Sequence, residues 1–309
     1  MASIDIVIPV YKPGSCFKET LLSITRQIVD RDIELKVYVV DDGNNDADLI
    51  QIVGEFESIE LVTLKDNSGR AKACNHGALQ GKGQFIFFLD ADCEILGEEL
   101  INQHCKVLLS GFDVSYGSTK SQVNQNEFWE SYLKAVEKKR EKLIATGNYL
   151  LITSNNIAIR RTLFEKVGGF DQNYQGYGFE DRDLIAKLIK SNAKVNYSTN
   201  LIVHHDVGFS LYDVIGKLEE AGELTSGVFA KNHPEQYRKL AYYYLDVRCH
   251  PIALKLPLAI TNVILMPLVR AIDGHLLKTK LLRPGLVVLV KLLSAMAFLK
   301  GTGKSVSRG

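Results

Sequence analysis

Gly83–Cys93 reads GQFIFFLDADC, and this stretch decides how the fold is interpreted. Phe85–Leu89 is an uninterrupted apolar run, which is typical of a strand buried on both faces. The run ends at Asp90 and Asp92, with Ala91 between them. On an extended chain, alternation directs both carboxylates to one side and the alanine to the other. The sequence therefore predicts a buried strand that delivers two carboxylates to one edge of a sheet.

Further strands and helices precede this stretch. Apolar runs predict strands at Ile4–Val10, Leu35–Val40 and Ile59–Leu64, and apolar spacing predicts helices at Phe17–Ile28 and Asp48–Phe56. Strands that alternate with helices imply an α/β fold with a mostly parallel sheet. Ligands of such sheets bind beyond the carboxyl ends of the strands. Acids that follow these strands should therefore gather at one rim.

The alternation weakens in the second half of the chain. We expect a charged helix at Glu127–Ile144, a short strand at Leu201–His205, and helices throughout beyond Leu211. The five cysteines are odd in number and include no Cys-x-x-Cys pair, which disfavours a disulfide scaffold or a zinc ribbon and favours a reducing compartment. The opening residues have no charged leader before a long apolar stretch, so a cytoplasmic location is expected.

Charge is distributed unevenly, although the whole chain carries only +1. Residues 252–309 contain nine Lys or Arg and one acid, Asp273, a formal charge of about +8. Leu256–Val269 has 14 uncharged, mainly apolar residues, fewer than the roughly 20 that span a membrane, and three prolines are expected to interrupt helices: Pro257, Pro267 and Pro284. We expect helices that lie in an anionic membrane interface. A buried helical layer or a homo-oligomer interface stays open as an alternative role for this tail. Its lack of polar and aromatic interleaving disfavours binding to nucleic acid.

Asp-x-Asp alone carries little information, because it occurs four times here. Only Asp90 and Asp92 follow a buried strand. Two close carboxylates repel each other unless a cation lies beside them, and hard oxygen ligands suit Mg²⁺ or Mn²⁺. The alternative is a solvated turn whose acids cap the next helix.

Several motifs in order make the chain resemble family 2 glycosyltransferases, over about residues 3–206. The motifs are VIPVYKPG, VYVVDDGNND, NSGRAKACNHGAL, FIFFLDADCEIL, NNIAIRRTLFEKVGGFD and GYGFEDRDL. The resemblance implies an inverting enzyme with a GT-A fold. Together with the composition of the tail, it divides the chain into a GT-A domain at 1–210 (nucleotide-binding half about 1–100, acceptor half 101–210), a helical extension at 211–251 and a membrane-contact region at 252–309.

The resemblance also implies a donor site. The acids after the second strand, Asp41 and Asp42, would recognise the base and ribose, since carboxylates accept hydrogen bonds from N–H and O–H groups. Pro9 and Tyr11 would line the base pocket. The alternative for the two acids is a turn formed by the Asp-Asp-Gly-Asn cluster.

NSGRAKACNHG resembles the loop that holds the diphosphate. Gly69 permits close approach of the backbone, Arg70 offers a planar fork to a phosphate, and the following helix offers its N-terminus. Alternatively, Asn67 or Ser68 caps the helix and the arginine is solvated.

The metal site follows from the same resemblance. Asp92 would be the direct ligand of Mn²⁺ or Mg²⁺, while Asp90 would touch ribose or metal-bound water. His204 or His205 in LIVHHDVGFS would complete the site, and the sequence does not choose between them. A structural histidine pair is the alternative.

GYGFEDRDL supplies the catalytic residues that the resemblance implies. Asp181 would be the base, and Glu180 would bind the acceptor or orient the base. The glycines around Tyr177 would let it close over the sugar. Alternatively, both acids only complement the dipole of the helix that they begin.

Upstream, Asn155 and Asn156 could hydrogen-bond sugar hydroxyls or be ordinary turn residues. Arg160 and Arg161 are expected to be surface charges, and His104 to be structural.

The resulting prediction is a metal-dependent inverting glycosyltransferase that moves a sugar, expected from a UDP-sugar, to a hydroxyl of a glycan or lipid-linked saccharide. One alternative is a sugar-1-phosphate nucleotidylyltransferase, although that enzyme class needs a glycine-rich basic loop after the first strand. Another is a non-catalytic protein that binds nucleotide-sugars or a membrane surface.

Overall fold

The computed structural model describes residues 1–122, 127–206, 210–273 and 283–308. The chain forms two compact units, each assembled from separate segments. The first unit comprises Met1–Gln122, Val136–Gln172 and Leu184–Val207; the second comprises Val123–Ala135, Asn173–Asp183 and Gly208–Gly309. These two units are each built from segments that are separate in sequence, whereas the sequence led us to expect continuous domains. The continuous boundaries stay predictions.

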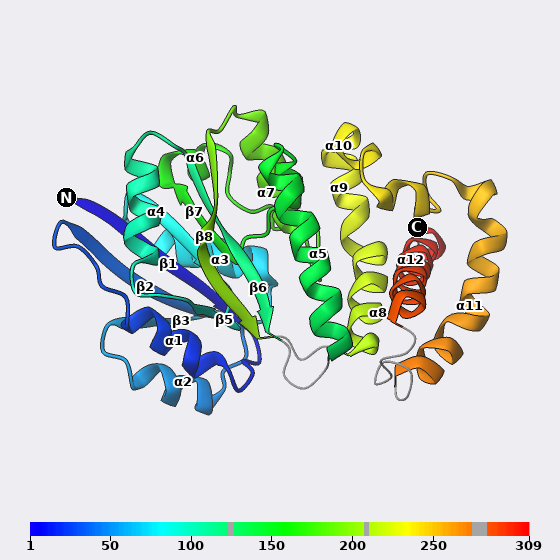
Figure 1. Ribbon diagram of the computed structural model, residues 1–309, viewed down its shortest axis with the longest axis horizontal. Helices are drawn as coiled ribbons and strands as arrows, with labels where there is room; N and C mark the ends of the chain where they lie inside the picture. Colours follow the sequence, from blue (N-terminus) through cyan, green and yellow to red (C-terminus); the bar gives the residue numbers. More distant parts are fainter. Residues whose placement is uncertain (123–126, 207–209, 274–282, 309) are drawn as a thin grey trace. The chain divides into compact units, whose positions relative to one another are not determined.

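An eight-stranded mixed sheet forms the first unit, in the order β3-β2-β1-β4-β7-β6-β8-β5 (Figure 1). Strand β1 is parallel to β2 and β4, and β2 is parallel to β3. Strand β7 is antiparallel to β4 and β6, β8 is parallel to β6, and β5 is antiparallel to β8. The predicted α/β class is therefore confirmed. The strands are β1 (Ala2–Val10), β2 (Ile33–Asp41), β3 (Ile59–Thr63), β4 (Phe85–Leu89), β5 (Cys93–Ile95), β6 (Val114–Gln122), β7 (Asn156–Arg160) and β8 (Val195–Asp206).

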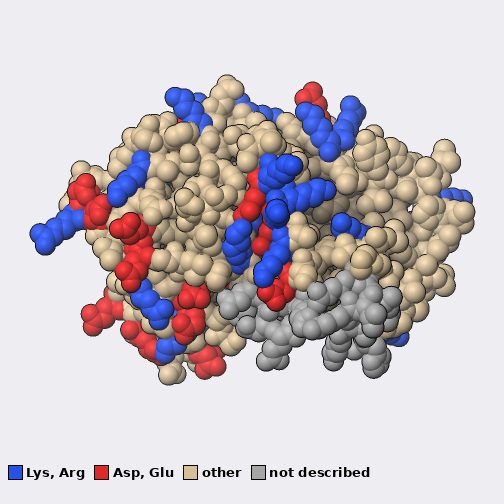
Figure 2. Space-filling view, viewed as in Figure 1, with Lys and Arg blue, Asp and Glu red and all other residues tan. Residues whose placement is uncertain are grey.

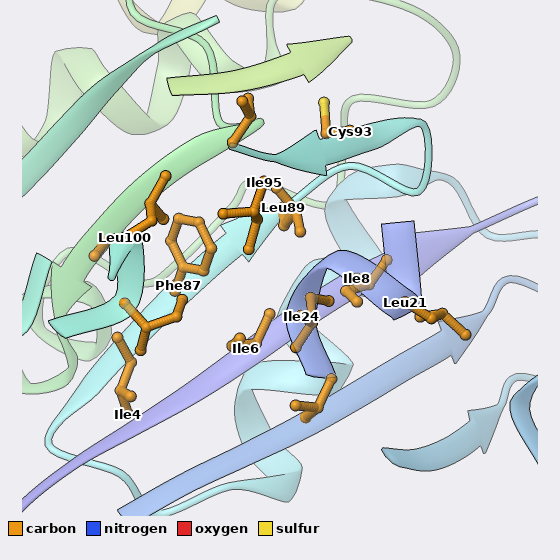
Figure 3. Close-up of a cluster of buried hydrophobic side chains, with 14 of the residues drawn as sticks. Ile4, Ile6, Ile8, Leu21, Ile24, Phe87, Leu89, Cys93, Ile95 and Leu100 are labelled. Carbon is orange, nitrogen blue, oxygen red and sulfur yellow. The ribbon is translucent and has the colours of Figure 1, made fainter. Parts of the chain in front are cut away.

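Alternate residues of each central strand pack into two different cores, because successive side chains point to opposite faces. Ile4, Ile6 and Ile8 pack with α1, α2 and α4 (Figure 3), whereas Val7 and Phe88 pack on the other face with α3, α6 and α7. Burial on both faces explains the near-continuous apolar runs that identified the strands. The helices are α1 (Phe17–Thr25), α2 (Ala47–Gly54), α3 (Arg70–Gln80), α4 (Leu100–Leu109), α5 (Glu127–Ala145), η1 (Tyr149–Leu151), α6 (Arg161–Lys166) and α7 (Glu180–Lys190).

Two expectations about local structure are wrong. Asp90–Asp92 is a turn and not an extended segment, because the Cys93 amide donates to the Asp90 carbonyl oxygen at 3.1 Å before β5 begins. Arg161 is not a surface charge: its side chain is only 12% exposed and pairs with Asp5 at 2.5 Å. Arg161 also donates to backbone carbonyl oxygens of Gly83 and Ala78, so each of its three guanidinium nitrogens has a partner inside the fold.

Helices form the described part of the second unit beyond Leu211, as predicted. They enclose a core that includes Trp129, Leu211, Leu265 and Leu293. The elements are α8 (Leu211–Glu220), the π-helical turn η2 (Ala221–Thr225), α9 (Ser226–Asn232), α10 (Pro234–Arg238), η3 (Ala241–Leu245), α11 (Pro251–Asp273) and α12 (Arg283–Arg308).

Helix α11 corrects the expectation that prolines break the tail. It runs through Pro257 and Pro267 for 23 residues. Both prolines are exposed, so the backbone carbonyls that lose their helical partners lie on the side of the helix that faces away from the core. By length and composition α11 and the segment Pro284–Val306 could each cross a membrane, with 17% and 44% of their apolar windows buried. The helix length expected from the uninterrupted apolar run was therefore too short, because the helix continues past the basic residues that flank that run.

Candidate functional site

Parallel pairing brings the carboxyl ends of β1, β2 and β4 to one rim of the sheet, as expected. Val10 on β1 is in register with Asp41 on β2, and the amide of Asp42 donates to the Val10 carbonyl oxygen at 2.8 Å. Pro9 is half-buried and Tyr11 is 47% exposed just beyond the end of β1. Their assignment to a base pocket stays a prediction.

The two acids after β2 organise the rim. Asp41 is fully buried, and its two oxygens accept from the amides of Asn44 and Asn45 at 2.9 and 3.0 Å, which closes the turn. Asp42 accepts from the amides of Ser68 and Gly69 at 2.8 and 2.9 Å, so it fixes the start of α3. Burial raises the pKa of Asp42 against the lowering effect of these two bonds. The turn alternative is therefore present, and recognition of a base or ribose stays a prediction.

Arg70 is held at the first position of α3. Its guanidinium pairs with Asp90 at 2.5 Å and donates to the Ser154 hydroxyl at 2.7 Å, while it lies 5.9 Å from the centre of the Phe170 ring. The side chain is 25% exposed, so it is neither buried nor freely solvated. Gly69, with φ 88°, permits the sharp entry into the helix. Ser154 was not predicted, and its position in TSNN offered only a turn signal.

Asp92 and His205 form the second polar pair at this rim, which favours His205 over His204 as the proposed metal ligand. His205 Nε2 lies 3.1 Å from Asp92 Oδ2, whereas His204 points to the other face of β8, because neighbouring residues of a strand alternate. Cys93 opposes His205 in the ladder, and one ligand atom from each of Asp92, Cys93 and His205 lies within 4.8 Å of the others. Cys93 was not among the predicted ligands, although it directly follows the Asp-Ala-Asp motif.

The donor set fits a divalent cation. Carboxylate oxygen and imidazole nitrogen together suit Mn²⁺ better than Mg²⁺, which prefers oxygen ligands. Burial, followed by the charges of Asp90 and Asp92, raises the pKa of the Cys93 thiol well above its usual value. Sulfur is a soft ligand, which suits Mn²⁺ less well than carboxylate oxygen or imidazole nitrogen does. Asp92 and His205 are therefore the residues that would hold the ion.

The two asparagines after Ser154 differ in position. Asn156 is fully buried: both amide hydrogens bond backbone oxygens, of Ser118 and Leu201, and its oxygen faces His104 Nε2 at 3.1 Å. This placement is that of a core residue and not of one that contacts a sugar. Asn155 is 7% exposed, and its oxygen accepts from the hydroxyls of Thr119 and Thr153. Its donor-binding role stays a prediction.

Glu180 and Asp181 begin α7 and belong to the second unit. Glu180 is 8% exposed and Asp181 is half-buried. Asp183, in the same turn, is buried; its Oδ1 accepts from His233 Nε2 at 2.8 Å and from the Tyr174 hydroxyl at 3.3 Å. The first turn of α7 is thus tied to the helices of its own unit. The catalytic roles of Glu180 and Asp181 stay predictions.

Comparisons with known proteins agree on a class of enzyme. Residues 5–168 match the family model described as glycosyl transferase family 2, and residues 140–206 match that of the N-terminal domain of galactosyltransferase. A pre-mycofactocin glycosyltransferase of Mycobacterium tuberculosis is 27% identical over 241 residues, which cover 75% of this chain and 48% of that protein. The chain thus spans about half the length of this curated relative.

Two solved structures share the fold. A mannosyltransferase of Pyrobaculum calidifontis, in complex with GDP-Man and Mn²⁺, superposes with a TM-score of 0.62 at 18% identity, over 98% of this chain and 86% of that one. S. aureus TarS 1-349 in complex with UDP gives a TM-score of 0.55 at 18% identity, over 100% of this chain and 92% of that one. At such identities the likeness establishes the fold.

Proposed function

The chain belongs to glycosyl transferase family 2; from this premise we propose that it is a glycosyltransferase acting on nucleotide sugars, by inverting, metal-dependent transfer of a sugar from a UDP-sugar to a hydroxyl of a glycan or lipid-linked saccharide. The observation that supports it is the arrangement at the rim, where the Asp92–His205 pair lies beside the Asp90–Arg70 pair. One pair suits a cation and the other suits a phosphate.

The reacting groups follow from this assignment. Asp181 accepts the proton of the acceptor hydroxyl while that oxygen bonds to the anomeric carbon. The bond from that carbon to the diphosphate oxygen breaks, the nucleoside diphosphate leaves with the bonding electrons, and the configuration inverts. Arg70 exchanges Asp90 for a phosphate oxygen of the donor. A divalent ion held by Asp92 and His205 would neutralise charge on the leaving group.

Replacement of the proposed base tests the reaction. Asp181→Asn should abolish transfer and leave the thermal midpoint unchanged, whereas Asp213→Asn, the same change at an exposed position of the second unit, should leave transfer intact. Turnover and thermal unfolding are measured for both variants with Mn²⁺ present. Retained turnover in Asp181→Asn refutes the base assignment.

The next experiment can identify the donor without knowledge of the acceptor. A thermal-shift screen of UDP-, GDP- and dTDP-sugars with Mn²⁺ should give the largest rise in midpoint with one UDP-sugar, because a ligand that binds only the folded state stabilises it. A larger rise with a GDP-sugar replaces the donor assignment and leaves the reaction type intact.

We infer further that the outer face of α11 contacts anionic membrane from the cytoplasmic side. The right-hand side of Figure 2, where Figure 1 draws α11, is a mostly uncharged surface. Lys255 and Arg270 flank this face, and the basic excess of residues 252–309 complements anionic lipid. The apolar side chains recur every three or four residues and are largely exposed: Ile252 92%, Leu256 70%, Ile260 48% and Val263 72%.

Vesicle flotation of the full chain tests this contact. The double variant Leu256→Glu/Val263→Glu should stay with soluble protein, while the wild type floats with vesicles that contain anionic lipid. Leu79→Glu, at a 78% exposed leucine of the first unit, is the matched control and should float like the wild type. Equal flotation of the double variant and the wild type removes the proposal.

A further inference from the structure

The loop before Glu180 has an unusual backbone. Gly176, Gly178 and Phe179 have φ values of 105°, 93° and 69°. For the glycines this conformation costs little, but for a phenylalanine it is strained by about 1–3 kcal/mol. Phe179 is 3% exposed and packs against Phe229 and Tyr242, with ring centres 5.4 Å apart in both cases. Packing within the second unit therefore maintains the strain immediately before the acids.

Two side chains at the ends of the π-helical turn η2 hydrogen-bond the backbone of this loop. The Tyr177 amide donates to Glu220 Oε1 at 3.0 Å, and the Thr225 hydroxyl donates to the Tyr177 carbonyl oxygen at 3.0 Å. Glu220 directly precedes η2 and Thr225 is its last residue. Isolated π-helical turns within longer helices occur frequently at functional sites, because the wider turn displaces side chains from their regular positions.

Close packing on both sides holds the turn in place. On the loop side, a Cβ on Gly176 would lie 2.6 Å from Glu220 Oε1, and a Cβ on Gly178 would lie 3.3 Å from the Ala221 Cβ. On the opposite side, a Cβ on Gly222 would lie 2.5 Å from the Phe298 carbonyl oxygen of α12. A larger residue at Gly222 would push the turn away from the α12 backbone, and a larger residue at Gly176 would displace the Glu220 carboxylate that bonds the loop.

We propose that Glu220 and Thr225 are positioning residues for sugar transfer: they clamp both polar groups of the Tyr177 peptide backbone and so fix the direction in which Glu180 and Asp181 are presented. This inference rests on the proposed function of Asp181. Neither positioning residue touches substrate; each acts through the loop. Catalytic groups displaced by about 1 Å lose as much as a hundredfold in rate.

Thr225→Val removes one half of the clamp with almost no change in side-chain volume. It should lower kcat about tenfold or more and leave the KM for the donor within about twofold, because it changes the presentation of the base and not the binding of the nucleotide. Thr225→Ser, which keeps the hydroxyl, should restore kcat to within about threefold of the wild type.

Thr302→Val is the matched control. Thr302 is fully buried in the same unit, and its hydroxyl bonds the backbone of α12 and accepts from the Val247 amide. It should lower the thermal midpoint and leave kcat unchanged. An unchanged kcat in Thr225→Val, or an equal loss of kcat in Thr302→Val, overturns the proposal.

Hydrogen exchange of the Tyr177 amide provides a readout that does not depend on activity. Glu220→Ala should accelerate its exchange at least tenfold and lower kcat, while Glu220→Gln, which retains an acceptor oxygen, should do neither. Unchanged exchange in Glu220→Ala overturns the clamp. Full turnover of Asp181→Asn instead overturns the proposed function while the exchange result stands, so the two failures are distinguished.

Discussion

The two ends of strand β4 carry the same kind of charge pair in different surroundings. Near its start, Asp5 accepts from the Gly83 amide at 2.7 Å and pairs with Arg161, and the two side chains are 2% and 12% exposed. Just after its end, Asp90 pairs with Arg70 at the same separation of 2.5 Å, but these side chains are 28% and 25% exposed. A charge buried at the first end cannot turn to water or to a ligand if its partner is lost, whereas the partly exposed pair can exchange partners at small cost. Burial therefore distinguishes the charges that stabilise the fold from those that we propose for ligand binding.

The largest effect is expected at the exposed end. Asp92→Ala should lower kcat/KM about a thousandfold, or about 4 kcal/mol, because the proposed ion loses its carboxylate ligand. The thermal midpoint should change little, because the Asp92 side chain is 45% exposed. Asp48→Ala, in an Asp-x-Asp pair that begins α2 and does not end a strand, is the control and should be fully active. Wild-type activity in Asp92→Ala would show that Asp92, at the exposed end of β4, does not serve the proposed reaction.

At the buried end the effect should be on stability. Arg161→Ala leaves Asp5 charged and buried, which should lower the free energy of unfolding by about 3–4 kcal/mol in urea titrations. Arg160→Ala, at the neighbouring arginine with a 26% exposed side chain, should lose much less. Similar losses in the two variants would show that burial does not distinguish these charges.

Midway along the strand, a neutral histidine makes the fold sensitive to acid. His104 packs on Phe87 with ring centres 4.9 Å apart, and burial lowers its pKa from 6.5 to about 4. The unfolded chain therefore binds more protons between pH 4 and 6.5, so stability falls as the pH is lowered through that window, by up to about 3 kcal/mol. Urea titrations at several pH values measure the fall. It should persist in His76→Gln and shrink in His104→Gln; an equal fall in both excludes His104 as its source.

The smallest effect concerns the exchangeable pair. Arg70→Lys retains a charge but loses the planar fork, so the Kd of the nucleoside diphosphate should rise about tenfold, or about 1.4 kcal/mol, with little change in stability. Isothermal titration measures the Kd, and Lys72→Arg is the control at an exposed position in the same helix. An unchanged Kd in Arg70→Lys would mean that Arg70 stays with Asp90 when the nucleotide binds.

Much of the first unit could be predicted from apolar runs. Phe85–Leu89 was identified to the residue, because a strand buried on both faces has an uninterrupted apolar sequence. Strand β6 was missed, since its sequence VSYGSTKSQ is largely polar and its hydroxyls bond Glu141 of α5 and Asn155, which directly precedes β7. Arg161 was misjudged for the related reason that its partner, Asp5, lies 156 residues away in the chain.

By itself, the sequence determined which acids follow the strands and, through parallel pairing, that they share a rim. Only the tertiary structure decided that His205 and not His204 meets Asp92, that Asn156 is a core residue, and that η2 grips the loop before Glu180. Local sequence specifies where a strand or helix begins and which side chains alternate along it. The neighbours of a side chain depend on strand register and helix packing between distant segments, which are decided when the whole core forms.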